Sequence, residues 1–420
     1  MQLTPPHLIR NSLTVATCSL LSLDAAQAGY FDYESSWDVD AAVLFYSEQN
    51  RVDVVEPVLQ IKKEIGEGEF VTIKLAFDSI SGATPNGATP ASTPQTFTSP
   101  SGESRSTTAA HQLPLVSFTD ARAAASIDWE LPLSRISRAQ YHANFSRETD
   151  YTALGAGATL RWDVNSKLTT LTASIAANLD QVKPTGGLPA QLSPLNMDND
   201  NSRGGSRSKN TYDLLAGVTQ VLTRRTLMQL NFSYGKNRGY LTDPYKIVSV
   251  VHGTTGATQD YLHEQRPGTR TRHVLYWKTV YHLPEDVVHV AYRYYWDDWD
   301  IRSNTLDLTY RLQLGARTYL EPHYRYYTQT AANFFTHSIM AGNVPDYASA
   351  DLRLAALQSS TAGLRFAHQL DPGSEWGLGF DIMRQTGNAH PVSAIGEQKN
   401  ERLFSNLNAT SVTADFSMQF

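Results

Sequence analysis

The sequence has one cysteine, few charged residues and no long apolar run beyond its first residues. Cys18 is the single cysteine among 420 residues. A mature chain that begins after Cys18 forms no disulfide and offers no thiolate as a metal ligand or nucleophile. Beyond the N-terminus, no apolar segment reaches the roughly 18 residues of a membrane helix. A chain of this kind can cross a membrane only with β-strands that close into a barrel.

The charge balance excludes a general affinity for nucleic acid. Charged residues are 18% of the chain and the formal net charge is −6, so no overall attraction draws it to a polyanion. The sequence also lacks a phosphate-binding loop, a dinucleotide fingerprint and a Gly-x-Ser-x-Gly elbow. Its histidines are scattered, without the spacing of a metal or haem site. We therefore expect no nucleic-acid partner, cofactor, bound metal, catalytic residue or enzymatic activity.

The N-terminus has the pattern of a secretory signal peptide. Arg10 supplies a positive charge, residues 12–23 are mostly apolar, and residues 26–28 (AQA) form a small-x-small cleavage pattern. This predicts a cleaved signal peptide over residues 1–28 and a mature domain over residues 29–420. The alternatives are a buried N-terminal helix and a lipoprotein acylated at Cys18, although Thr17 is bulky for that cleavage position.

Apolar and polar residues alternate with a period of two along most of the mature chain. Val71, Ile73 and Leu75 alternate with polar or small residues, and residues 226–235 and 287–296 follow the same period. This alternation indicates strands with one apolar and one polar face. A soluble sandwich or propeller would alternate in the same way, so the connections must decide between these folds.

The connections alternate between short and long. Residues 66–69, 132–134 and 223–225 read as tight turns, whereas residues 79–120, 181–210 and 236–270 are long loops. Outer-membrane barrels have this rhythm, with short periplasmic turns and long extracellular loops. We predict an all-β fold, a transmembrane antiparallel barrel of about sixteen strands. The strands are expected to start near residues 37, 54, 70, 122, 138, 154, 168, 211, 226, 272, 287, 304, 318, 359, 375 and 406.

The last predicted strand ends the chain on an aromatic residue. Val412, Ala414, Phe416, Met418 and Phe420 share one face. Such an alternating strand with a terminal Phe resembles the C-terminal signature that the barrel-assembly machinery recognises. We therefore expect Phe416, Met418 and Phe420 to form an assembly signal. The expected location is the bacterial outer membrane, with membrane lipid and the assembly machinery as partners.

Three segments resemble one bacterial family, the domain of unknown function numbered 3570. They are residues 42–57 (AVLFYSEQNRVDVVEP), residues 74–90 (KLAFDSISGATPNGATP) and residues 294–335, which include YYWDDWDIRSNTLDLTYRLQ. The resemblance covers most of the mature chain and implies an outer-membrane barrel without an assigned activity. The genomic setting of the family, beside flavin-attachment and thioredoxin-like envelope proteins, implies envelope partners.

Charged residues follow the polar faces of three consecutive predicted strands. If these faces point inward, opposite charges meet across neighbouring strands, because a lipid-facing Arg near the midplane would cost roughly 2–4 kcal/mol. The cluster is either a constriction or binding site in the lumen, or an ion-pair network that holds the wall. Its members are His289, Arg293, Asp307, Arg311, Glu321, His323 and Arg325.

A run of acidic residues between two tryptophans begins the loop after residue 296. Asp297, Asp298 and Asp300 could offer oxygen ligands to a divalent cation. The alternative is that the tryptophans belong to an interfacial aromatic belt and the carboxylates are solvated at the mouth of a loop. A rim active site that combines Asp297 and Asp298 with His337 is a further, less favoured interpretation.

The sequence favours transport over catalysis. A barrel of this size can leave an aqueous passage, which predicts a channel or transporter for small polar solutes. The alternative is a non-conducting scaffold for envelope partner proteins, which could be redox proteins. Bulky inward residues such as Tyr295, Tyr319 and Tyr327 could obstruct the passage. The loop over residues 79–120 is rich in Ser, Thr, Pro and Gly, which favours mobility over a folded plug.

Overall fold

The computed structural model describes residues 37–98, 105–195, 202–203, 205–371 and 373–420. The predicted signal peptide over residues 1–28 lies outside these residues. Within them, no helix is long and apolar enough to cross a membrane.

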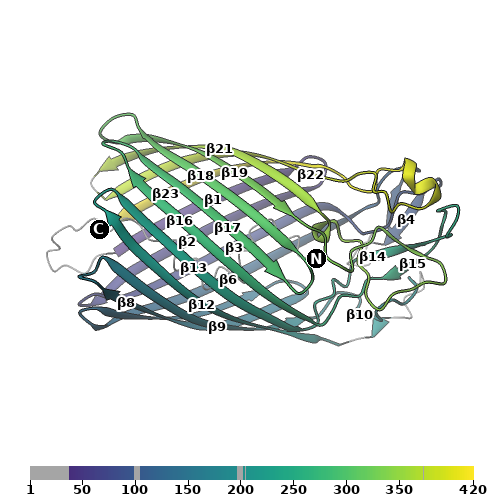
Figure 1. Ribbon diagram of the computed structural model, residues 1–420, viewed down its shortest axis with the longest axis horizontal. Helices are drawn as coiled ribbons and strands as arrows, with labels where there is room; N and C mark the ends of the chain where they lie inside the picture. Colours follow the sequence, from purple (N-terminus) through teal and green to yellow (C-terminus); the bar gives the residue numbers. More distant parts are fainter. Residues whose placement is uncertain (1–36, 99–104, 196–201, 204, 372) are drawn as a thin grey trace.

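Sixteen antiparallel strands form one closed barrel, which confirms the predicted fold (Figure 1). Every expected strand start falls within or beside one of these strands. The first and last strands close the wall, with Val43 opposite Ala414. The wall strands are β1 (Trp37–Glu48), β2 (Val52–Gly66), β3 (Glu69–Pro85), β6 (Leu115–Ser134), β7 (Ser137–Arg147), β8 (Tyr151–Val164), β9 (Thr169–Val182), β12 (Arg207–Thr223), β13 (Thr226–Gly239), β16 (Thr269–His282), β17 (Val287–Asp297), β18 (Arg302–Gln313), β19 (Thr318–Gln329), β21 (Leu357–Asp371), β22 (Ser374–Gly387) and β23 (Leu407–Gln419).

The outer face of the wall is apolar and the inner face is polar. Large apolar side chains are exposed along the outside, for example Leu75, Ile175 and Leu364, which are 48%, 61% and 48% exposed. Thr172 and Ser174 of β9 and Thr159 of β8, on the inner face, are buried and polar. An apolar exterior around a polar interior is the pattern of a barrel that spans a membrane.

One end of the barrel, here called the turn end, carries the tight turns. In the turn between β8 and β9, Asn165, Ser166 and Lys167 all have positive φ angles, between 50° and 66°. The β2–β3 turn uses Gly68, at φ 68°, where a residue with no Cβ adopts the left-handed conformation without strain. Both the start of β1 and the end of β23 lie at this end, since Asp38 pairs with Gln419.

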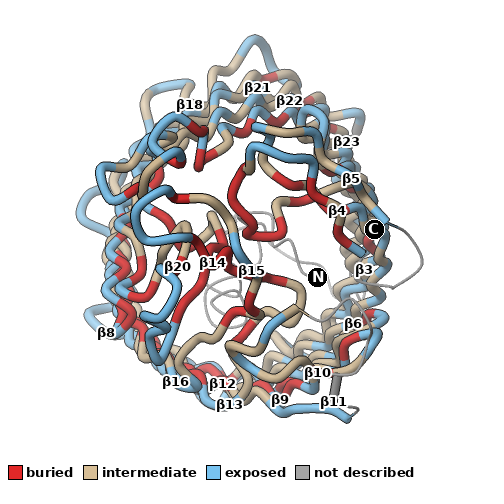
Figure 2. The backbone as a smooth tube through the Cα atoms, turned by 90° about the vertical axis from the view of Figure 1, so that its right-hand side faces the viewer, coloured by how far each residue is buried: buried red, intermediate tan, exposed pale blue. Residues whose placement is uncertain are grey.

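The opposite end, here called the loop end, carries five long connections that fold together into a cap (Figure 1). Viewed toward the loop end, the buried segments of the cap lie across the mouth of the barrel (Figure 2). The cap contains a three-stranded sheet in the order β15-β14-β20 and a β4–β5 hairpin. Its elements are β4 (Gln95–Thr98), β5 (Arg105–Thr108), β10 (Leu188–Pro189), β11 (Ser202–Arg203), β14 (Ile247–Val251), β15 (Thr258–His263), β20 (Ser338–Met340), η1 (Leu352–Leu354) and η2 (Gly396–Asn400).

The cap includes much of the loop for which composition favoured mobility. Residues 79–85 and 115–120 of that loop belong to β3 and β6, and part of the remainder packs against β14. Phe97 is 4% exposed and Thr89 is 3% exposed. The Thr89 backbone N–H donates to Ser249 Oγ at 3.0 Å. The described residues of this loop are therefore folded. Contacts with residues far away in the sequence bury its few apolar side chains.

Candidate functional site

The seven charged residues singled out from the sequence lie on β17, β18 and β19, at alternate positions. Asp307 stands between Leu306 and Leu308, which are 36% and 37% exposed on the outside. Asp307 pairs in register with Arg325 of β19, which stands between the exposed Tyr324 and Tyr326. These charged side chains therefore share the inner face of the wall.

Asp307 lies at the centre of the first group of ion pairs. Its carboxylate contacts Arg325 Nε at 2.6 Å and His323 Nε2 at 3.3 Å. The other ring nitrogen of His323 lies 3.6 Å from Asp381 on β22. The structure therefore joins three of the seven residues and adds a carboxylate that the sequence analysis did not single out.

Arg365 on β21 lies at the centre of a second group. Its guanidinium contacts Glu321 at 3.2 Å, Glu375 at 3.1 Å and Asp415 at 2.6 Å. It also donates to the hydroxyl oxygen of Tyr319 at 2.8 Å. Of these residues, only Glu321 was in the predicted cluster. The alternation of inward and outward residues could have placed the others on the inner face. In the last strand, for example, Asp415 alternates with the outward Ala414 and Phe416.

Glycines on the inner face let ion pairs reach across an intervening strand. Gly363 lies in register between His323 and Asp381, and a Cβ at Gly363 would lie 1.9 Å from Asp381 Oδ1. Gly235 likewise separates Asp213 from Arg272, whose ion pair measures 2.9 Å. The side chains that make these contacts pass over the backbone of a glycine, which has no side chain to obstruct them.

The structure leaves the other predicted cluster members outside this network. Arg293 and His289 form no ion pair within the described part of the chain. Arg311 stacks on Tyr319, with its guanidinium carbon 3.5 Å from the centre of the ring. Tyr295, Tyr319 and Tyr327 all belong to the inner face, so aromatic bulk accompanies the charges on β17 and β19.

The candidate cation site after β17 is a structural turn in this structure. Asp297 Oδ1 accepts from the backbone N–H groups of Trp299 and Ile301, each at 3.0 Å. Its Oδ2 accepts from Arg270 Nε at 2.7 Å, and Asp298 accepts from the Thr271 N–H. Both oxygens of Asp297 are thus occupied by protein donors. Asp297, Asp298 and Asp300 are not among the described residues whose ligand atoms converge.

A different acidic group converges near the loop end. One ligand atom each from Asp120, Glu148 and Asp150 lies within 4.8 Å of the others. Asp120 Oδ1 accepts from Thr149 Oγ1 at 2.9 Å. Carboxylates at a water-facing rim often stand together without a metal, so this arrangement assigns no ligand.

The cap holds its own buried ion network. Arg353 contacts Asp351 at 2.6 Å and Asp243 at 2.8 Å, and Arg266 contacts Asp351 at 2.8 Å. Burial raises the pKa of Asp351, but Arg353, Lys246 and Arg266 together hold that pKa well below its ordinary value. Two of these contacts, Arg353 with Asp243 and Arg266 with Asp351, join residues more than 80 positions apart in the chain and link distant segments of the cap.

His337 is partly buried in the cap against an aromatic ring. Its imidazole packs edge-on against Phe335, with 5.0 Å between the ring centres. Burial lowers the pKa of His337 to about 4, so the ring is neutral at neutral pH. No carboxylate pairs with it in the described part of the chain, and the rim site that would combine it with Asp297 and Asp298 gains no support.

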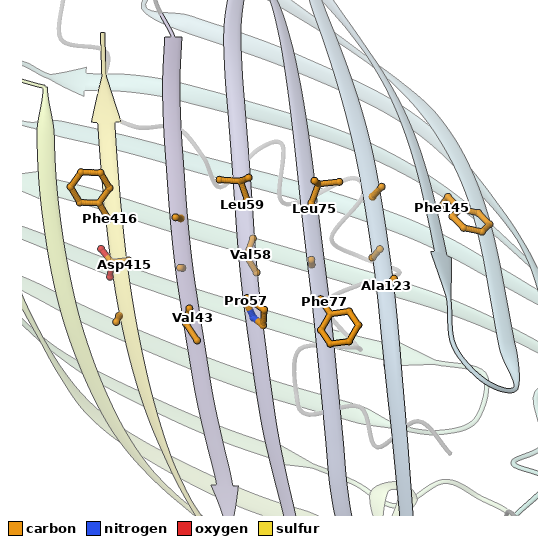
Figure 3. Close-up of a pocket in the computed structure, with 16 residues that line it drawn as sticks. Val43, Pro57, Val58, Leu59, Leu75, Phe77, Ala123, Phe145, Asp415 and Phe416 are labelled. Atoms are coloured by element: carbon orange, nitrogen blue, oxygen red, sulfur yellow. The ribbon is translucent and has the colours of Figure 1, made fainter.

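An apolar hollow of about 740 Å³ lies in the wall where the first and last strands meet. Small outward residues such as Ala41 and Ala125 form its floor. Phe416, Leu75 and Phe145 surround it (Figure 3). Because these aromatic and aliphatic side chains are exposed on the outer face, the hollow faces lipid. Its lining is apolar except for Asp415, which belongs to the Arg365 group.

The predicted assembly signal lies on the same outer face. Phe416 and Met418 are each 37% exposed and Phe420 is 64% exposed. The Phe420 backbone N–H donates to the carbonyl oxygen of Trp37 at 2.9 Å, so the last residue takes part in closing the barrel. Recognition of these residues by the assembly machinery stays a prediction.

The comparisons place the chain in a family. The family described as "Protein of unknown function (DUF3570)" matches residues 10–420. The chain belongs to this family. No curated protein matches the sequence significantly.

The chain is also similar to several solved structures. A mutant of the ferric enterobactin receptor PfeA from Pseudomonas aeruginosa is 11% identical, with a TM-score of 0.44, over 92% of this chain and 60% of that chain. The siderophore receptor PirA from Acinetobacter baumannii is 8% identical, with a TM-score of 0.43, over 86% of this chain and 54% of that chain. A bacterial polysaccharide outer membrane secretin is 7% identical, with a TM-score of 0.43, over 93% of this chain and 100% of that chain. The family member described here thus spans about 60% of the length of the PfeA chain.

Proposed function

We propose that this protein is an outer-membrane channel or transporter for small polar solutes. The observation that carries the proposal is the closed sixteen-strand wall with an apolar exterior and a polar interior. A barrel with this number of strands is wide enough to leave an aqueous passage. The ion pairs of Asp307 and Arg365 join side chains of the inner wall to one another, between adjacent strands or across one intervening strand.

The second candidate is a non-conducting scaffold for envelope partner proteins. The observation that favours it is the cap, whose buried ion network and apolar clusters make a rigid cover over the loop end. A scaffold has no need of an open lumen, and its partners would bind the cap or the turn end. The proposed location, the bacterial outer membrane, is the same for both candidates.

Conductance in planar lipid bilayers tests the proposal. The mature protein is refolded in detergent, and its heat-modifiable migration on a gel shows that the barrel has formed. We expect discrete conductance steps, and larger or more frequent steps when residues 86–114 of the cap are replaced by a short turn. Folded protein that conducts neither with nor without these residues would overturn the channel and favour the scaffold.

A further inference from the structure

Three inward cations on neighbouring strands have no ion-pair partner among the described residues. They are Lys278 on β16, Arg293 on β17 and Arg311 on β18. Most of the inner-wall arginines contact a carboxylate, as Arg122, Arg161 and Arg272 do. Since an inward charge with no partner contributes little to the stability of the wall, its presence needs another explanation.

The register places these cations at regular steps along the wall. Arg311 lies opposite Val287, Lys278 lies opposite Ala291, and Arg293 stands on β17 itself. His289 occupies the step between Arg311 and Lys278 and adds a charge only when protonated. Successive inward positions are about 6.6 Å apart along a strand, so the ladder of Arg311, His289, Lys278 and Arg293 covers about 20 Å.

On the β13 side, the wall offers Lys278 no negative charge. Lys278 pairs in register with Gln229 of β13, and the next inward positions of β13 are Asn231 and Ser233. Gln229 is 5% exposed, and its Nε2 donor has no hydrogen-bond partner among the described residues. A buried amide donor without an acceptor costs free energy, and here it stands beside an unpaired ammonium group.

On the other side, the carboxylate of Asp307 already contacts two other residues. Asp307 lies two strands from Lys278 at the same level, across Ala291. Its oxygens contact Arg325 and His323 at 2.6 and 3.3 Å. Lys278 therefore stands on one side next to a donor that lacks an acceptor among the described residues, and on the other side near a carboxylate that two residues already contact.

We propose that the ladder of Arg311, His289, Lys278 and Arg293 selects and binds anionic solutes that carry a carboxylate or phosphate group. The inference rests on the proposed channel function and names its substrate class. The rung at Lys278 is the tightest position, because the ammonium and the Gln229 amide together supply charge-assisted and neutral hydrogen bonds to an oxyanion. The flanking side chains of His289, Arg311 and Arg293 bind the anion in turn as it moves along the wall.

Block of chloride current by inorganic phosphate tests the assignment, with Lys278→Gln compared with Lys62→Gln. Lys62 is an inward cation on β2 that contacts Asp38 at 3.9 Å, so both changes remove one positive charge by the same substitution. Loss of a charge-assisted hydrogen bond should raise the half-blocking phosphate concentration about tenfold or more in Lys278→Gln. Lys62→Gln should change it less than about twofold, and Lys278→Arg should restore most of the block.

The outcomes separate this inference from the channel itself. Channels that conduct but show equal phosphate block in Lys278→Gln and Lys62→Gln would overturn the ladder and leave the channel standing. If the folded protein does not conduct, the channel fails, and calorimetric titration of the detergent-solubilised protein with inorganic phosphate decides the ladder. Binding that Lys278→Gln abolishes and Lys62→Gln retains would then support the site, and an absence of binding to the unaltered protein would refute it.

Discussion

Two sectors of the inner wall differ in how many of their cations form ion pairs. In the sector from β19 to β23, Arg365 contacts three carboxylates and His323 lies between two more. In the sector from β16 to β18, Lys278, Arg293 and Arg311 form no ion pair within the described residues. The comparison indicates that paired charges hold the wall, whereas unpaired charges are available to a solute.

The largest expected difference between the sectors is in stability. Replacing Arg365 by Gln leaves Glu321, Glu375 and Asp415 close together without their shared cation. We expect the free energy of unfolding to fall by about 3 kcal/mol. Arg311→Gln removes an arginine of the other sector that has no ion pair, and it should change stability by less than about 1 kcal/mol. Urea unfolding of both variants in detergent or lipid vesicles measures the difference, and equal losses would contradict the division.

Two glycines of β22 sharpen the comparison within one strand. A Cβ at Gly377 would lie 2.5 Å from both Arg365 Nη2 and Asp415 Oδ2, whereas a Cβ at Gly379 would find its nearest atom at 3.8 Å. We predict that Gly377→Ala destabilises the barrel by about 2 kcal/mol, because the added methyl group separates the ion pair. Gly379→Ala should stay within about 0.5 kcal/mol of the unaltered protein. If Gly379→Ala is as harmful as Gly377→Ala, a general loss of backbone freedom explains the effect better than the ion pair.

In the cap, the partly buried imidazole of His337 has no carboxylate partner among the described residues. Because burial lowers the pKa of His337 to about 4 in the folded cap, the unfolded segment binds a proton first as pH falls below about 6.5. The contribution of His337 is fully present above that pH and is lost progressively toward pH 4. At pH 5.5 the loss should be about 1.4 kcal/mol. Limited proteolysis of the cap at pH 7.5 and 5.5 follows it, and His337→Phe should reduce the pH dependence.

The strands were predictable from sequence because alternation is a local signal. Val71 to Phe77 and Met228 to Tyr234 show their two faces without knowledge of their neighbours. The partner of each charge was not predictable, since it depends on the register. Arg325 could be placed on the inner face, but its contact with Asp307 required the pairing of β18 with β19.

The cap was less predictable than the wall. The contact between Thr89 and Ser249 spans 160 residues, and the low-complexity composition of the first long loop contains no periodic signal for it. The contacts of Asp297 were similarly unpredictable. Its role in binding the Trp299 and Ile301 N–H groups depends on a turn whose conformation the residue types alone do not specify.

The cations of β16 to β18 that have no ion-pair partner among the described residues are proposed to select the solute. The most direct measurement is the reversal potential of single channels in a potassium chloride gradient, for the unaltered protein and for the triple variant Lys278→Gln, Arg293→Gln, Arg311→Gln. We predict that the triple variant shifts the reversal potential strongly toward potassium selectivity. The charge-conserving variant Lys278→Arg, Arg293→Lys, Arg311→Lys should stay near the original value. A triple variant with an unchanged reversal potential would contradict the claim.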